Sequence, residues 1–275
     1  MYLYFKKGCA FLDKRIDNAS VENTPREDII VGRNPVLEAV RSGREIDRLY
    51  VAHGVSGGTI TAIIAKCSER GIVIKEVAST KLDWLAGGAN HQGVAVSIAA
   101  HSYSTVDEIL EYAKEKGEPP FIIICDEIED PHNLGAIIRT AEACAVHGII
   151  IPKRRAASLN ATVAKSASGA LEYMRVAKVT NLVAEIEKLK EAGVWVYGAD
   201  MDGSSWCSGD YTGATALVIG NEGKGIGRLV AEHCDGMISL PMQGFINSLN
   251  ASVAAGVLMY EVARQRTGTK AHNSK

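Results

Sequence analysis

Five polar residues in the second half of the chain have side chains suited to catalysis, and they lie after predicted strands or near the starts of predicted helices. They are Asn133, Arg139, Glu222, Ser248 and Asn250. Each amide or hydroxyl alone is typical of a helix cap. An arginine on a helix rich in Ala and Ile, and an acid directly after a buried strand, need partners. As a set, the five residues predict one site.

A glycine-rich turn follows the strand that ends near Gly220, in the segment Leu217–Gly227. A second short apolar strand, Ile238–Met242, is stopped by Pro241, and a helix begins at Ser248. Two strand ends and a helix start that carry small or amide residues leave backbone N–H and C=O groups open to a ligand. The pattern therefore predicts a site for a nucleotide-like cofactor, although the GxGxxG and Walker patterns are both absent.

Size and composition are ordinary for a soluble globular chain of one large or two modest domains, with 275 residues, 47% hydrophobic and 23% charged. The net charge of −2 gives no global field toward RNA or a membrane, so any RNA contact needs a local basic patch. No membrane span or secretory signal is evident. The six cysteines have no CxxC or zinc spacing, which favours reduced thiols and a cytoplasmic protein. His132 and His147 are interpreted as surface or capping residues, and we expect no metal site.

Changes in pattern along the chain predict two domains. The first is a small α/β unit that begins with a helix capped by Asn34, with Pro35 at its first position. The second contains continuous apolar runs such as Phe121–Cys125, which are typical of buried parallel strands, and helices over Asn133–Val146 and Ser248–Gln265. The predicted boundaries are a flexible extension over 1–28, a first domain over 29–101, a linker over 102–120, a second domain over 121–268 and a tail over 269–275.

The polar segments of the second domain resemble the three motifs of the SpoU (TrmH-type) branch of the SPOUT methyltransferases. Asn133 with Arg139 matches the first motif, and the turn Gly220–Gly225 matches the second. The third motif is matched by Leu240–Gly244 together with Ser248–Ser252. In the first domain, Gly32–Ala39 and His91–Val94 resemble the substrate-binding domain of the same family. Within the family, Ile151–Ala157 and Ala161–Lys165 look most like the subgroup that methylates a guanosine ribose in large-subunit ribosomal RNA.

The resemblance implies an enzyme that uses S-adenosylmethionine to methylate a ribose 2′-hydroxyl of RNA. For the fold, it implies an L30e-like RNA-binding domain followed by a parallel-sheet domain with a deep trefoil knot, a rare feature in proteins. It also implies a homodimer whose interface includes the last helix. By position, the cofactor-binding residues are Gly220, Gly225, Leu240, Met242 and Leu249.

The resemblance also implies that Arg139 is catalytic. Because a guanidinium stays protonated in proteins, we expect Arg139 to bind the substrate phosphate and stabilise the developing alkoxide rather than to act as a base. Glu222 would orient Arg139 or accept the proton through water, while Asn133, Ser248 and Asn250 would hold the ribose and these side chains.

RNA contact is predicted for a basic segment over 153–178, which has six cations against the single acid Glu172. The candidate RNA-binding residues are Lys153, Arg154, Arg155 and Lys165, together with Arg33 in the first domain. Contacts of this kind weaken steeply with salt.

Three other functions fit parts of the pattern. The first is a transfer-RNA 2′-O-methyltransferase or an antibiotic-resistance ribosomal RNA methylase of the same fold. The second is a non-catalytic RNA-binding assembly factor, against which the complete polar set argues. The third is a small-molecule α/β enzyme, which leaves the basic segment and the first domain unexplained.

Overall fold

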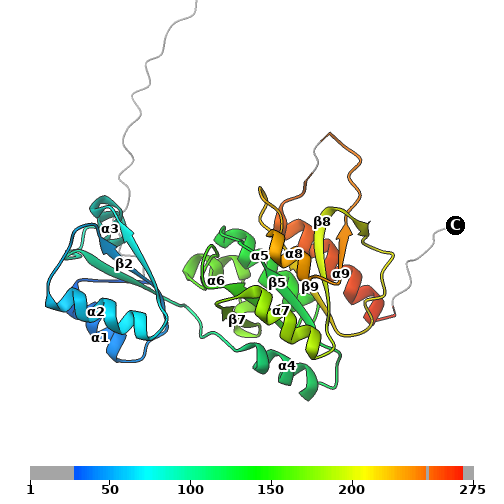
Figure 1. The fold of residues 1–275 in the computed structure, drawn as a ribbon, viewed down its shortest axis with the longest axis horizontal. Coiled ribbons are helices and arrows are strands. Elements are labelled where there is room, and N and C mark those ends of the chain that lie inside the picture. Colours follow the sequence, from blue (N-terminus) through cyan, green and yellow to red (C-terminus); the bar gives the residue numbers. More distant parts are fainter. Residues whose placement is uncertain (1–27, 246–247, 269–275) are drawn as a thin grey trace, which may run out of the picture.

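The computed structural model describes residues 28–245 and 248–268, and it shows two α/β units one after the other (Figure 1). The extension predicted over 1–28, apart from its last residue, and the tail predicted over 269–275 lie outside the described residues. No helix in the described ranges has the length and apolar character needed to cross a membrane.

The first unit is a four-stranded sheet in the order β1-β4-β2-β3, in which β2 and β3 are parallel and β4 is antiparallel to β1 and β2. Helices α1 and α2 bury one face of this sheet and the short helix α3 packs on the other. The elements are β1 (Ile29–Val31), α1 (Arg33–Arg41), β2 (Ile46–Ala52), α2 (Gly58–Glu69), β3 (Val73–Val77), α3 (Ser79–Ala86) and β4 (Val94–Ile98).

The second unit is a six-stranded sheet in the order β10-β8-β9-β5-β6-β7, and all its strand pairs are parallel. The α/β class and the parallel sheet predicted for this unit are confirmed, and the trefoil knot stays a prediction. The elements are α4 (Val106–Glu115), β5 (Phe121–Cys125), α5 (Pro131–Ala143), β6 (Gly148–Pro152), α6 (Ala161–Ala167), a 3₁₀ turn (Ala170–Glu172), β7 (Arg175–Val179), α7 (Leu182–Glu191), β8 (Trp195–Ser205), β9 (Thr215–Ile219), α8 (Arg228–His233), β10 (Gly236–Ser239) and α9 (Ala251–Arg266).

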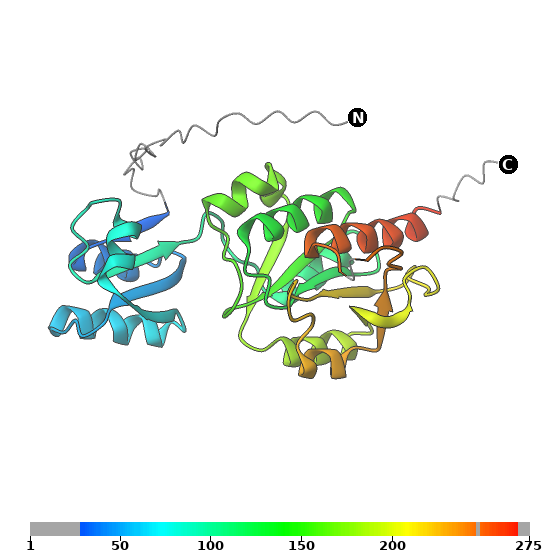
Figure 2. The same cartoon turned by 90° about the horizontal axis from the view of Figure 1, so that it is seen from above.

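Helices cover both faces of the larger sheet, which explains why its central strands are apolar throughout. Helices α5, α6 and α9 lie along one face and α7 and α8 along the other (Figure 2). All five residues of β5 are buried. Because every strand runs in the same direction, the loops after β5, β9 and β10 meet at one edge of the sheet, where ligands bind in open α/β folds.

Two helices begin earlier than the sequence predicts. Helix α1 starts at Arg33 after Gly32, whose φ of 93° suits glycine, so Asn34 is not the cap. Helix α5 starts at Pro131, and the side chain of Asp130 caps it by accepting the backbone N–H of His132 at 2.8 Å. Asn133 is therefore inside the first turn, which frees its side chain for other contacts.

Several strand and helix bounds also differ from the prediction. Strand β10 ends at Ser239, before Leu240, and α9 starts at Ala251 with Asn250 as its cap. Strand β7 and helix α8 were not predicted. The side chain of His147 is buried rather than on the surface, and its Nδ1 accepts the backbone N–H of Phe121 at 3.0 Å.

The segment 102–120, predicted as a linker, contains helix α4, which packs into the larger unit. The side chain of Thr105 caps it in a capping box with Glu108. Ile109 is fully buried against the larger sheet, and a Cβ at Gly148 would overlap its side chain. This helix therefore belongs physically to the second unit, because its apolar face has no other place to be buried.

An ion pair joins the two units. Lys178 of β7 donates to Asp47 of β2 at 2.6 Å, and the hydroxyl of Tyr103 donates to the same carboxylate at 2.6 Å. The side chains of Asp47 and Lys178 are 1% and 13% exposed. Lys178 thus has a protein partner and is not the free RNA-binding cation that the basic segment suggests.

Replacing Asp47 with asparagine should lower the free energy of unfolding by about 3 kcal/mol, because the Lys178 ammonium stays largely buried without a counter-charge. Urea unfolding followed by tryptophan fluorescence measures this. Glu111→Gln is the matched control: it breaks an exposed pair with Lys114 and should change the free energy by less than about 0.5 kcal/mol. Equal effects of the two variants would show that the interdomain pair is not stabilising.

Candidate functional site

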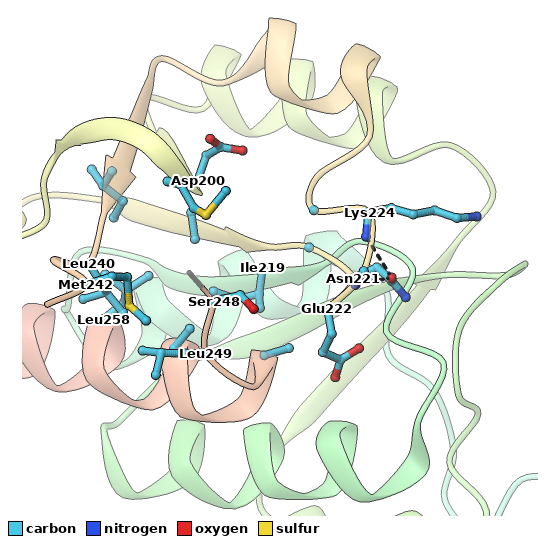
Figure 3. Close-up of a pocket in the computed structure, with 18 residues that line it drawn as sticks. Asp200, Ile219, Asn221, Glu222, Lys224, Leu240, Met242, Ser248, Leu249 and Leu258 are labelled. Atoms are coloured by element: carbon cyan, nitrogen blue, oxygen red, sulfur yellow. Dashed lines mark hydrogen bonds between the residues drawn. The ribbon is translucent and has the colours of Figure 1, made fainter. Parts of the chain in front are cut away.

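A cavity of about 370 Å³ opens where β9 and β10 end and α9 begins (Figure 3). Gly220, Gly225, Leu240, Met242 and Leu249, the five residues expected to bind the cofactor, all line it. Apolar side chains of Ile219, Ile238 and Leu258 line it as well. The fold therefore brings residues from three separate segments around one pocket of the size typical of small-molecule sites.

The glycine-rich turn that forms one wall of the cavity is held by its own hydrogen bonds. The Oδ1 atom of Asn221 accepts the backbone N–H groups of Gly223 at 2.9 Å and Lys224 at 3.2 Å. The backbones of Asn221 and Gly225 exchange two further hydrogen bonds, and Gly225 has a φ of 68°. A Cβ at Gly220 would overlap the backbone of Gly225 and Ile226. Hydrogen bonds and close backbone packing within the turn itself therefore fix the shape of this wall.

Two side chains that the sequence analysis did not single out fix this turn to the rest of the sheet. Asn221 donates through Nδ2 to the carbonyl of Glu127 at 3.1 Å. Asp126, directly after β5, accepts the backbone N–H of Gly227 at 2.7 Å. Burial raises the pKa of Asp126, while the hydrogen bond from Gly227 acts in the opposite direction. An asparagine at the start of a glycine-rich turn, between Gly220 and Glu222-Gly223, is the signal that could have identified the first of these, because its side chain can accept a backbone N–H two residues on.

A chain of side-chain amides links the start of α9 to Glu222. The Oδ1 atom of Asn250 caps α9 by accepting the N–H of Ser252 at 3.0 Å, so its Nδ2 is free to donate to Oδ1 of Asn133 at 2.9 Å. Nδ2 of Asn133 then donates to Oε1 of Glu222. The helix cap therefore fixes both amides, and through them one face of the Glu222 carboxylate, at the edge of the cavity.

The structure brings four of the five predicted catalytic residues to this place and leaves the fifth apart. Asn133, Glu222 and Asn250 form the chain, and Ser248 lines the cavity with Glu222 (Figure 3). Arg139 is exposed on α5, and its Nη1 donates to the hydroxyl of Ser168 at 3.3 Å.

Helix geometry explains why Arg139 lies apart. It comes six residues after Asn133, which corresponds to about 240° around the helix and about 9 Å along it. Of the charged residues that the structure describes, none forms an ion pair with Glu222. Within the described part of one chain, therefore, no guanidinium lies against this carboxylate.

Asp200 and Met201 also line the cavity and were not predicted. The apolar run Val194–Gly198 predicts a strand that ends at Gly198, whereas β8 continues to Ser205. The pairing of β8 with β10 shifts after Gly198, which pairs with Met237, so that Ser204 pairs with Ile238. The intervening residues bulge, and bulges are known to redirect side chains near active sites. The order of polar and apolar residues in this part of β8 gives no sign of the bulge.

The candidate RNA-binding residues do not form one continuous patch. Arg33 lies at the end of the first sheet where it donates through Nε to the carbonyl of Gln92 at 3.2 Å. Lys153 lies against Gly71 of the first unit. Arg154, Arg155 and Lys165 are exposed on the second unit, and Arg155 pairs with Glu127 at 2.7 Å. In the described ranges, no group of three or more His, Cys, Asp or Glu side chains is placed to hold a metal ion.

Two family models match the chain. The SpoU rRNA Methylase family matches residues 120–260, and the RNA 2′-O ribose methyltransferase substrate binding model matches residues 29–104. The chain belongs to the SpoU rRNA methylase family. The predicted family is thereby confirmed, and this SpoU methylase is an RNA methyltransferase of the SpoU/TrmH type.

Relatives with both units are similar along nearly their whole length. A protein described as a TrmH family tRNA/rRNA methyltransferase, YacO of Bacillus subtilis, is 48% identical over 242 residues, which cover 88% of this chain and 97% of YacO. A TrmH family relative from Staphylococcus haemolyticus is 46% identical over 246 residues, or 87% of this chain and 97% of the relative.

Solved structures show the same fold. The SpoU methyltransferase AviRb from Streptomyces viridochromogenes, in complex with the cofactor AdoMet, has a TM-score of 0.55 and 25% identity, and the match covers 87% of this chain and 90% of AviRb. The A. aeolicus TrmH/SpoU tRNA modifying enzyme has a TM-score of 0.51 and 30% identity over 59% of this chain and 84% of its own.

Proposed function

We propose that this SpoU methylase transfers the methyl group of S-adenosylmethionine to a ribose 2′-hydroxyl of RNA, and that the substrate is a guanosine of large-subunit ribosomal RNA in the cytoplasm. The observation that carries the proposal is the amide chain from Asn250 through Asn133 to Glu222 at the edge of the cavity. The resemblance of Ile151–Ala157 and Ala161–Lys165 to the guanosine-specific subgroup supports the choice of substrate.

The residues around the cavity fit S-adenosylmethionine, which AviRb binds. Apolar side chains such as Leu240, Leu249 and Leu258 provide a surface for an adenine ring, and the turn Gly220–Gly225 offers main-chain groups for its polar edge. Asp200 and Glu222 are the acids among the lining residues, against the single cation Lys224. Two carboxylates favour a cofactor that carries a positive sulfur and an ammonium group.

When bound, the cofactor supplies a methyl group on a positively charged sulfur. The work left to the protein is to position a ribose hydroxyl in line with that methyl group and to remove its proton, since an unactivated hydroxyl is a weak nucleophile. Asn133 holds one oxygen of Glu222, and the other oxygen has no partner among the described residues. That oxygen can accept the hydroxyl proton, directly or through water. Ser248 and Asn250 lie close enough to the cavity to hold the sugar.

A homodimer is part of this proposal, because α9 presents an exposed apolar stripe. Val253, Val257 and Tyr260 are 51%, 38% and 57% exposed, and they line a groove with Thr140 of α5, the neighbour of Arg139. In a twofold-symmetric dimer of this kind, the same face of α9 on each protomer would pack against its partner, which makes the interface isologous. It would bring Arg139 of one protomer toward the Glu222 of its partner, where the guanidinium can bind a substrate phosphate and stabilise the alkoxide.

Mixing two inactive variants should test the shared site. Arg139→Ala and Asn133→Ala are each expected to be inactive as pure dimers. After co-refolding at equal amounts, heterodimers should contain one complete site, which gives about a quarter of wild-type activity. Activity of the mixture no greater than that of the separate variants would place Arg139 and Asn133 of the same chain in each site.

Ribose-methylation mapping tests the function as a whole. Ribosomal and transfer RNA from cells with and without the gene should differ at one guanosine of the large-subunit RNA. A difference confined to transfer RNA, or an antibiotic-resistance phenotype, would favour the alternatives of the same fold. Calorimetry with S-adenosylmethionine separates these from an assembly factor, which should give no heat of binding.

RNA binding should weaken steeply as salt increases, because phosphate contacts release counterions. The slope of log K against log salt should fall by about 1 when either Arg154 or Lys165 is replaced with alanine. Lys188→Ala removes an exposed lysine already paired with Glu185 on α7 and serves as the control, with an unchanged slope. A wild-type slope near zero would argue against phosphate contacts altogether.

A further inference from the structure

A second cleft, of about 650 Å³, lies between the two units and has no place in the methyl-transfer site. One wall is the first sheet, from which Arg48, Tyr50 and Lys75 line the cleft. The other wall is the loop after β6, which contributes Arg154 and Asn160.

In the part of the chain that the structure describes, the helices of the first unit cover only part of the sheet wall. Alternate residues of β2 point to opposite faces, so that Leu49 and Val51 pack beneath α1 and α2. Helix α3, with only 8 residues, covers the other face at one end, where Leu82 and Leu85 pack. Among residues 28–245 and 248–268, no helix lies over the remainder of that face, which opens into the cleft.

Strand register places cations beside an aromatic ring on this open face. Tyr50 of β2 lies opposite Lys75 of β3, and Arg48 lies opposite Val73 on one side and Ser97 of β4 on the other. Since residues in register share a face of the sheet, Arg48 and Lys75 flank the half-buried ring of Tyr50.

The cations of the cleft have few protein partners. Of the residues the structure describes, none forms an ion pair or a side-chain hydrogen bond with Arg48, Lys75 or Arg154, whereas Arg155 pairs with Glu127. Asp28 and Glu129 are the acids that line the cleft. Cations that line the same cleft as an aromatic ring are the combination with which proteins hold single-stranded RNA, the charges on phosphates and the ring on a base.

The two walls of the cleft are held in a fixed relation. Asp47, next to Arg48 in β2, forms the buried pair with Lys178 of the second unit. The backbone N–H of Leu159, in the opposite wall, donates to the hydroxyl of Tyr103, which itself donates to Asp47. The cleft is therefore a preformed feature rather than a gap between independent units.

We propose that this interdomain cleft binds an unpaired nucleotide of the RNA substrate other than the one that is methylated, with its phosphates on Arg48, Lys75 and Arg154 and its base on Tyr50. The inference rests on the proposed function, because it takes RNA to be the substrate. The cleft would anchor the RNA at a set position relative to the cavity, so that the reacting ribose is selected by its location in the RNA.

The test uses the full-length protein and a transcript of large-subunit ribosomal RNA. The double variant Arg48→Gln/Lys75→Gln should weaken transcript binding at least about 10-fold and raise KM, with kcat and the Kd for S-adenosylmethionine unchanged. Arg41→Gln/Lys66→Gln is the matched control: it removes two exposed cations from α1 and α2, on the covered side of the same sheet. This control should bind within about twofold of wild type.

A second pair of variants tests the stacking role without changing charge. Tyr50→Leu should weaken binding about 10-fold, and Tyr50→Phe should bind as wild type does, because only the ring is needed. If the cleft double variant and the control double variant bind the transcript equally well, while the wild type still methylates it, the cleft does not bind the RNA. That result would leave the proposed function unaffected. A wild type that binds S-adenosylmethionine but neither binds nor methylates any RNA would overturn both.

Discussion

Replacing Arg139 with lysine should reduce kcat for RNA methylation by about 100-fold or more and leave the Kd for S-adenosylmethionine unchanged. Lysine keeps the charge but lacks the planar fork that binds a phosphate through two parallel hydrogen bonds. Arg139 is exposed and lies outside the residues that line the cavity proposed for the cofactor, so cofactor binding has no reason to change. Single-turnover kinetics with a labelled methyl group, together with calorimetry, separate the two quantities.

The control for this prediction is Ser168→Gly, which removes the hydroxyl that Arg139 contacts within its own chain. Ser168 has a φ of 50°, a conformation that glycine adopts readily, so the variant should fold. Its activity should stay within about threefold of wild type, because the hydroxyl of Ser168 has no role in the proposed reaction. Full activity of Arg139→Lys would show that the guanidinium fork is not needed.

Replacing Gly220 with alanine should weaken S-adenosylmethionine binding by about 100-fold or more, because the added methyl group overlaps the backbone of Gly225 and Ile226 and must displace the wall of the cavity. Flexible side chains can move aside, but this overlap is with main chain on the neighbouring arm of the same turn. Calorimetric titration measures the affinity, and urea unfolding verifies that the rest of the sheet remains folded.

Gly223→Ala is a close control, since Gly223 lies in the same turn. A Cβ there would meet only Oδ1 of Asn221, at 3.5 Å, which is an ordinary contact distance. This variant should bind S-adenosylmethionine within about threefold of wild type. If both glycine variants bind alike, the turn is not the wall that holds the cofactor.

The amide chain shows how one local rule of helix formation can help to build the candidate site. An asparagine cap is favoured wherever a helix begins, because it satisfies backbone N–H groups that have no partner in the helix. In this chain, capping by Asn250 directs its amide toward Asn133, which is buried and directs its own amide toward Glu222. A substitution at position 250 should therefore affect both the stability of α9 and the orientation of the carboxylate.

Much of the architecture follows from short-range patterns. The unbroken apolar run of β5 predicts a strand buried on both faces, and the structure has it. The first residue of a helix was harder to predict where two possible helix starts lie close together in the sequence. Asp130–Pro131 and Asn133 are all compatible with a helix start, and in the structure Asp130 is the residue that caps α5. The length of β8 depends on its pairing with β10, which local sequence does not encode.

By itself, the sequence determined the family and the residue types of the candidate site, because short motifs identify both. It also determined the two-unit organisation, because the pattern of apolar residues predicts the strands and helices of each unit. Only the tertiary structure decided that Asn133, Glu222 and Asn250 form one hydrogen-bonded chain, that Arg139 faces away from it within a single chain, and that Lys178 is held by Asp47. The physical reason is that these contacts join residues 29 to 131 positions apart in the sequence. Their geometry depends on the order of strands in the sheet and on how each helix is rotated about its axis. Neither can be predicted from the residues adjacent in the sequence.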